Sequence, residues 1–140
     1  MGTTLQILLA VFAGLAALVH VFAFVLESII WPKPKVWKRF GVKSQADADV
    51  LEQMAFNQGF YNLFLAIGTG IGLFLLVYGN VMGGKWVLLI TLSSMVLAAA
   101  VLLLTNRKLW RAALLQGLIP LLGLACLLWA VTIRVPLMVL

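Results

Sequence analysis

The stretch Met54–Tyr78, MAFNQGFYNLFLAIGTGIGLFLLVY, decides the fold of this chain. It carries no Asp, Glu, Lys or Arg, and it is longer than the about 20 mostly apolar residues that a membrane-spanning helix needs. Continuous hydrophobicity of this length is not typical of an amphipathic helix on a soluble protein. The stretch therefore predicts a transmembrane helix, and the other segments follow from it.

Three more stretches have the same character: Leu5–Trp31, Lys85–Thr105 and Trp110–Ile133. Over the 140 residues, 64% are hydrophobic and 10% are charged, against roughly 45–50% and about 25% in soluble domains. Short loops between spans favour antiparallel neighbours. We predict an all-α, integral membrane four-helix up-down bundle that forms one transmembrane domain over 1–140, with spans at about 5–31, 54–78, 85–105 and 110–133.

The basic residues predict how the chain is oriented. Five of the ten lie in the loop 32–53 and three lie around the turn between the third and fourth spans: Lys33, Lys35, Lys38, Arg39, Lys43, Arg107, Lys108 and Arg111. Cytoplasmic loops are enriched in Lys and Arg. We therefore expect a cytoplasmic loop 32–53, a multi-pass protein of the cell inner (plasma) membrane, and both termini on the non-cytoplasmic side. The clustering indicates contact with membrane lipid headgroups and not with nucleic acid.

Several smaller features predict local structure. Ser44 followed by Asp47 is typical of a helix N-terminus, so we expect a short helix that runs into the second span. The glycines Gly68 to Gly72 predict close helix packing. Small residues on the first span, Ala13 to Ala17, are compatible with a homo-oligomer and equally with packing inside one bundle.

Two titratable residues, His20 and Glu27, lie inside the first apolar stretch. A charged group at the centre of a span costs about 2.5 kcal/mol or more, so such residues commonly mark a site or a specific polar contact. Seven residues place the two on nearly the same helix face but about 10 Å apart. That separation disfavours a direct hydrogen bond between them and allows both to line one cavity.

Polar residues of the other spans lie at comparable depth. Counting along the spans indicates a cytoplasm-facing pocket whose ligand-binding residues would be His20, Glu27, Asn57, Gln58, Tyr61, Asn62, Ser94 and Gln116. In hydrocarbon each of these groups needs a partner, and contact inside the bundle provides one. The alternative is that the same residues only join helices. The sequence predicts no metal site and no cofactor, and Cys126 is interpreted as a buried apolar residue.

The segment Asn57-Gln58-Gly59-Phe60-Tyr61-Asn62, together with the His20 to Glu27 spacing and Phe40-Gly41, resembles the family catalogued as domain of unknown function 1304. The resemblance extends over nearly the whole chain. It implies a small four-span membrane protein and no established activity. Many members have an acidic residue directly before the histidine, where this chain has Val19.

Three functions are compatible with these residues. The first is a binder or carrier of a small amphiphilic or lipid-like molecule in the polar pocket. The second is a membrane-embedded isomerase with Glu27 as proton donor and His20 as relay, and these two are then the candidate catalytic residues. The third is a structural or accessory subunit without a ligand. The sequence leaves open whether the protein is an enzyme.

Overall fold

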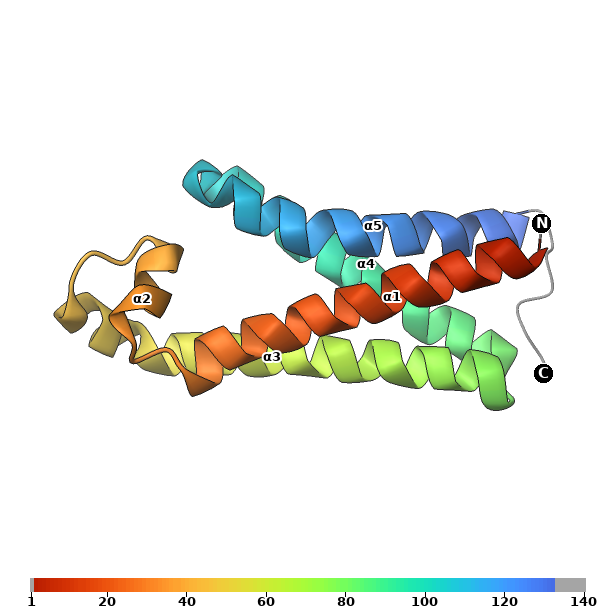
Figure 1. Cartoon of the computed structure of the whole chain (residues 1–140), viewed down its shortest axis with the longest axis horizontal. Coiled ribbons are helices and arrows are strands. Elements are labelled where there is room, and N and C mark those ends of the chain that lie inside the picture. Colours follow the sequence, from red (N-terminus) through yellow and green to blue (C-terminus); the bar gives the residue numbers. More distant parts are fainter. Residues whose placement is uncertain (1, 133–140) are drawn as a thin grey trace.

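The protein is helical throughout the part that the structure, a computed structural model, describes, which is residues 2–132 (Figure 1). The helices in chain order are α1 (Gly2–Phe24), η1 (Val25–Ile29), α2 (Pro34–Trp37), η2 (Lys38–Phe40), α3 (Gln45–Tyr78), α4 (Val81–Thr105), η3 (Arg107–Leu109) and α5 (Trp110–Thr132). No strand occurs among these residues. The predicted all-α bundle is confirmed.

Four helical segments are long and apolar enough to cross a membrane: Thr3–Ile29, Gln45–Tyr78, Val81–Thr105 and Arg107–Thr132. This is a multi-pass membrane protein. Helix α4 begins at Val81, because Asn80 caps it by accepting a hydrogen bond of 2.8 Å from the Gly83 amide. Gly83 and Gly84 therefore lie in the first turn of α4.

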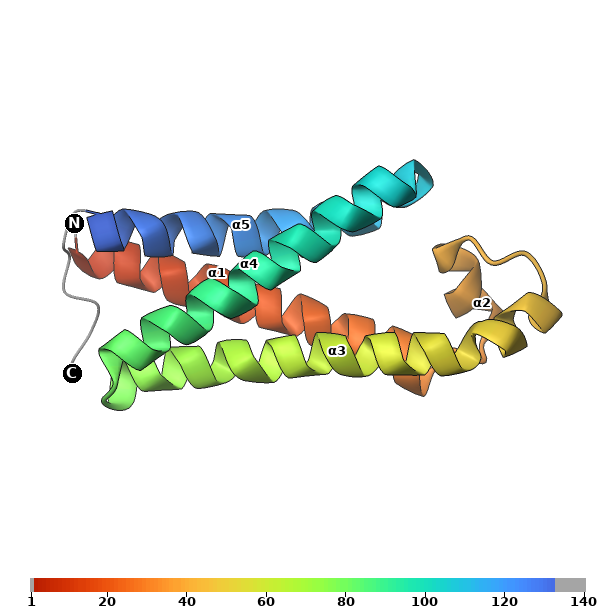
Figure 2. The same ribbon diagram turned by 180° about the vertical axis from the view of Figure 1, so that it is seen from behind.

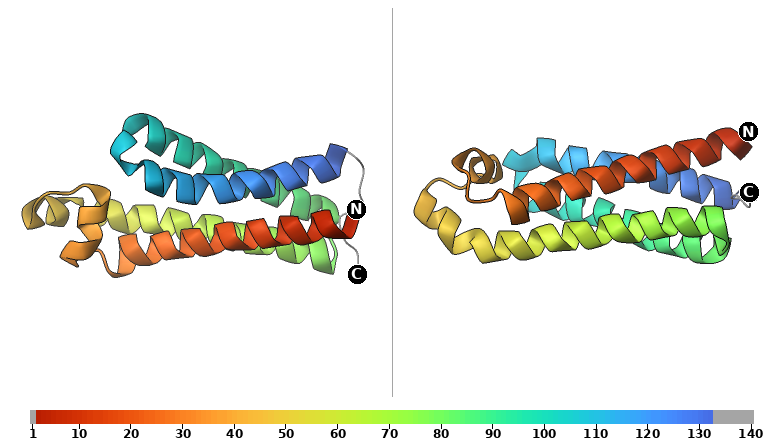
Figure 3. Two further views of the ribbon diagram at one scale, coloured as in Figure 1. Left: turned by 45° about the horizontal axis from the view of Figure 1, so that its top comes forward. Right: turned by 60° about the horizontal axis from the view of Figure 1, so that its bottom comes forward.

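The four long helices form a ring in which each packs on two neighbours. Helix α1 contacts α3 and α5, and α4 contacts the same two helices from the other side. The start of α1 and the end of α5 lie at the same end of the bundle (Figures 1 and 3). Towards the opposite end α4 runs away from α3, as Figures 1 and 2 both show, so the α4–α5 hairpin diverges from the α1–α3 pair.

Small residues bring the helix axes together. A Cβ atom at Gly84 would lie 2.8 Å from the Gly72 carbonyl oxygen, and a Cβ atom at Gly68 would lie 2.8 Å from Thr91 Cγ2. Gly70 faces open space instead, so the predicted close-packing glycines are Gly68 and Gly72 without Gly70. Ala13 on α1 is fully buried inside the bundle.

Helix α3 is longer than the membrane requires. Its 34 residues span about 51 Å at 1.5 Å per residue, whereas the hydrocarbon core is about 30 Å thick. The additional turns at its N-terminal end extend past the α4–α5 turn (Figure 2). The predicted short helix after Ser44 is confirmed as these first turns, because the Ser44 hydroxyl accepts a hydrogen bond of 3.1 Å from the Asp47 amide.

The predicted loop 32–53 ends at residue 44, where α3 begins, and residues 32–44 fold against this extension. Trp31 and Trp37 are both buried there, in a small apolar cluster with Ala48 and Ala55 of α3. The Trp31 indole donates a hydrogen bond of 3.0 Å to the Ala48 carbonyl. The first helix and the start of α3 are thereby held side by side outside the four-helix core, which fixes the position of Glu27 between them.

Candidate functional site

Glu27 lies where the first span leaves α-helical geometry. Residues Val25–Ile29 form a π-helical turn, in which the Ile30 amide donates to the Val25 carbonyl at 3.0 Å. Such turns are rare and occur frequently at functional sites. The turn is still part of the apolar segment Thr3–Ile29, and the Glu27 side chain is only 9% exposed.

Asn62 of α3 is the partner of this carboxylate. Its side-chain amide donates a hydrogen bond of 2.8 Å to Glu27 Oε2, and Asn62 is itself buried. A buried polar group without a partner costs several kcal/mol in hydrocarbon, so the pair satisfies a requirement of both residues. The two residues come from different helices, and the bond therefore also joins η1 of the first span to α3.

Gly59 lets η1 approach α3 closely enough for this bond to form. A Cβ atom at Gly59 would collide with the Ser28 hydroxyl oxygen and would lie 3.1 Å from Glu27 Cβ. The Ser28 hydroxyl donates a hydrogen bond of 2.8 Å to the Phe56 carbonyl, which lies on α3 nearly two turns before Asn62. The glycine inside the polar motif is thus the contact point that places Glu27 beside Asn62.

Aromatic rings pack on one another at the same interface between the first span and α3. Phe24 of α1 meets Phe60 of α3 edge to face, with ring centroids 5.1 Å apart, and Phe60 also contacts Phe56 and Phe64. Sequence reasoning did not select Ser28 or these rings. The available signal was Gly59, since a glycine in a span indicates close approach of a neighbouring helix.

His20 is buried separately from Glu27. It is 2% exposed, and its Nδ1 lies 2.9 Å from the Ala16 carbonyl oxygen on the preceding turn of α1. With Nδ1–H as the donor, this bond satisfies one ring nitrogen within the helix. Among residues 2–132 no hydrogen bond joins His20 to Glu27, as the spacing along α1 predicted.

The other predicted site residues do not gather around Glu27. Asn57, Gln58 and Tyr61 are exposed on the surface of α3, and Tyr61 keeps 65% of its surface. A physical reason is their depth in the membrane. Gln58 is twenty residues from Tyr78, which is about 30 Å along α3 and equals the thickness of the hydrocarbon core. Gln58 therefore reaches the membrane boundary, where polar groups meet water. Ser94 on α4 and Gln116 on α5 are half-buried.

The assembled site is therefore small and specific. It consists of one buried carboxylate, one amide that donates to it, and an aromatic wall between α1 and α3. It provides acceptor positions for a hydrogen-bond donor or a cation. Within the described chain, no group of three His, Cys, Asp or Glu residues could hold a metal ion.

The fold and this site define a class: small four-helix proteins of the membrane with a buried polar pair between the first and second spans. Residues 14–128 match the family model described as protein of unknown function (DUF1304). The match covers far more than half of the chain, and the protein belongs to that family. No curated protein and no solved structure matches the chain.

Proposed function

We propose that this protein binds or carries a small amphiphilic or lipid-like molecule, whose polar end is held at the Glu27–Asn62 pair. The observation that carries the proposal is the buried Glu27 carboxylate with Asn62 as its hydrogen-bond partner. A carboxylate has about four acceptor positions, and Asn62 occupies one of them. A hydroxyl, amide or ammonium group of a ligand would occupy others.

The surroundings favour an amphiphile. Phe24 and Phe60 provide apolar surface at the same interface of the first span with α3, suited to the hydrocarbon part of such a molecule. The turn η1 packs mainly on α1 and α3, and α4 and α5 contribute few contacts or none to it. A ligand would thus meet Glu27 chiefly between the first span and α3.

The same geometry gives less support to the isomerase. A proton relay needs His20 and Glu27 within hydrogen-bonding reach of each other or of one substrate. His20 instead contacts the carbonyl of Ala16 on its own helix. The structural-subunit alternative remains a distinct outcome of the experiment below, because the Glu27–Asn62 bond also joins two helices.

We further propose that the end of the bundle with the loop 32–53 faces the cytoplasm and that the membrane is the cell inner membrane. The loop and the α4–α5 turn lie at the end opposite the start of α1 (Figure 1). Both carry the clustered Lys and Arg residues. This distribution is typical of cytoplasmic segments.

Native mass spectrometry of the detergent-extracted protein tests the binding function. The wild type is expected to retain a small molecule, and Glu27→Gln is expected to lose it while it stays folded, because glutamine still accepts the Asn62 bond. The matched control is Glu52→Gln, the same change at an exposed position of α3. If no molecule is retained, or if Glu27→Gln retains it fully, the proposal is wrong and the pair is structural.

A further inference from the structure

A second candidate site lies outside the four-helix core, between residues 40–43 and the first turns of α3. It is a pocket of about 510 Å³. Its apolar walls come from Phe40, Val42, Val50 and Leu51, and its two charged residues are Lys43 and Asp47. This volume falls in the range of about 300–1,000 Å³ that is typical of small-molecule sites. The function proposed for Glu27 does not use it.

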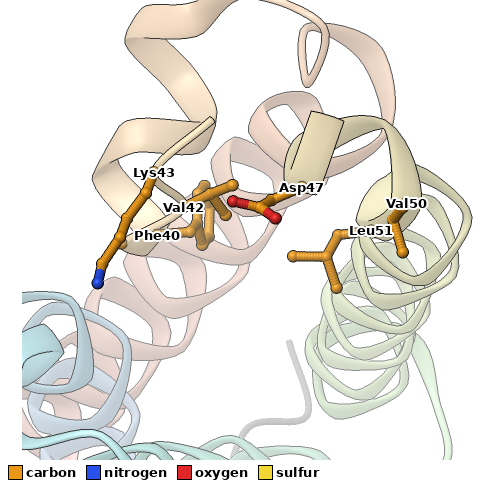
Figure 4. Close-up of a pocket in the computed structure, with 7 residues that line it drawn as sticks. Phe40, Val42, Lys43, Asp47, Val50 and Leu51 are labelled. Atoms are coloured by element: carbon orange, nitrogen blue, oxygen red, sulfur yellow. The ribbon is translucent and has the colours of Figure 1, made fainter. Parts of the chain in front are cut away.

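The two charges face different parts of this pocket. Figure 4 shows the Asp47 carboxylate directed into the space between Val42 and Leu51, and the Lys43 side chain extended away from it. Asp47 Oδ2 accepts a hydrogen bond of 2.7 Å from the Ser44 hydroxyl, which leaves Oδ1 for another partner. Lys43 is exposed. A ligand that carries an anionic and a cationic group would pair with both.

The position of the pocket along the membrane normal indicates which molecules can reach it. Leu51 precedes Tyr78 by 27 residues, which is about 40 Å along α3. Tyr78 is exposed at the opposite end of the helix, where aromatic residues favour the interface. The membrane including its headgroups is about 40–45 Å thick. The pocket therefore lies in or beside the headgroup layer of the opposite leaflet.

We propose that this pocket holds the phosphoethanolamine headgroup of a membrane phospholipid, with its phosphate at Lys43 and its ammonium at Asp47. A headgroup with only negative charge would be repelled by Asp47, so the charges in the pocket fit a headgroup that carries both signs. The quaternary ammonium of phosphatidylcholine cannot donate a hydrogen bond to Asp47. The primary ammonium of phosphatidylethanolamine donates to a carboxylate oxygen.

The experiment uses the full chain in phosphatidylcholine nanodiscs that contain equal small fractions of phosphatidylethanolamine and phosphatidylglycerol. Native mass spectrometry of the ejected protein counts the lipids that it retains. Phosphatidylethanolamine is expected to be enriched about threefold over its share of the nanodisc, the size of effect that an exposed ion pair gives. Lys43→Gln and Asp47→Asn are each expected to reduce this enrichment.

The controls separate this site from general charge and from the intramembrane site. Lys35→Gln and Asp49→Asn change exposed residues that do not line the pocket, and both should leave the enrichment intact. Glu27→Gln should leave it intact as well, whatever happens to a ligand at Glu27. Enrichment of phosphatidylglycerol instead, no enrichment, or equal loss in the controls would overturn the proposal, as would a copurifying peptide in the pocket.

Discussion

Asn62 donates a hydrogen bond of 2.8 Å to the Glu27 carboxylate across the interface between the first two spans. The bond joins residues that are 35 positions apart in the chain. Both partners are buried.

A double-mutant cycle measures the strength of this bond. Glu27→Leu and Asn62→Leu each leave one buried polar group without its partner, so the double mutant should lose less stability than the sum of the two single mutants. The coupling is expected at about 0.6–1.7 kcal/mol, the range found between membrane helices. Detergent-induced unfolding followed by circular dichroism provides the free energies. Strictly additive losses would mean that the bond contributes nothing to stability.

Gly59→Ala tests the contact that places Glu27. The added methyl group meets Ser28 and Glu27, so the substitution is expected to destabilise the protein by about 1–3 kcal/mol, as overpacking does. Gly70→Ala on the same helix is the matched control, because nothing lies within 4 Å of its Cβ position. That variant should be neutral or gain up to about 1 kcal/mol from helix propensity. Equal effects of the two would contradict the close approach at Gly59.

Two glycines at the α3–α4 crossing should differ in their tolerance of alanine. A Cβ atom at Gly84 meets backbone atoms, the Gly72 carbonyl and the Leu76 amide, both at 2.8 Å. A Cβ atom at Gly72 meets chiefly the Leu88 side chain, which can change rotamer. Gly84→Ala is therefore expected to cost more stability than Gly72→Ala in the same unfolding assay. The reverse order would show that α4 shifts more easily than the Leu88 side chain.

The two buried indoles of the loop cluster should also differ. Trp31 Nε1 donates to the Ala48 carbonyl, whereas Trp37 Nε1 is the one buried side-chain nitrogen or oxygen without a partner in the described residues. Phenylalanine removes the N–H group in both cases. Trp31→Phe should cost about 0.5–1.5 kcal/mol more than Trp37→Phe in thermal unfolding, because only it loses a hydrogen bond. Similar losses would indicate that packing alone decides both.

Cysteine labelling checks the proposed orientation. In a Cys126→Ser background, Lys43→Cys and Met82→Cys place exposed thiols at opposite ends of the bundle. A membrane-impermeant maleimide should label Lys43→Cys only in inside-out vesicles and Met82→Cys only in right-side-out vesicles. The opposite result would invert the topology.

Most of the fold could be predicted from the sequence, because apolar length alone defines a membrane span. The Met54–Tyr78 and Lys85–Thr105 stretches lie within two of the long helical segments. The other two predicted stretches overlap Thr3–Ile29 and Arg107–Thr132, and the predicted end at Ile133 lies outside the described residues. The first span ends at Ile29, two residues before the predicted Trp31 and close to Pro32, which disfavours helix at the residue before it. That Glu27 and Asn62 lie close together could also be predicted from the sequence, because both lie a few residues from the same membrane boundary.

The rotation of each helix about its own axis was harder to predict from the sequence. A helix that is apolar on all sides has no periodicity to show which face meets its neighbours. Depth counting therefore placed Asn57, Gln58 and Tyr61 in the pocket, although α3 directs these three outward. The π-helical turn at Val25–Ile29 has no sequence signature either, and it changes the register between His20 and Glu27.

The length of α3 fixes the positions of two distant side chains relative to each other. Asp47 in the headgroup-layer pocket and Asn62 inside the membrane are fifteen residues apart on one uninterrupted helix, which makes them two points on a rigid rod about 22 Å apart. When the rod turns about its axis, both side chains turn through the same angle.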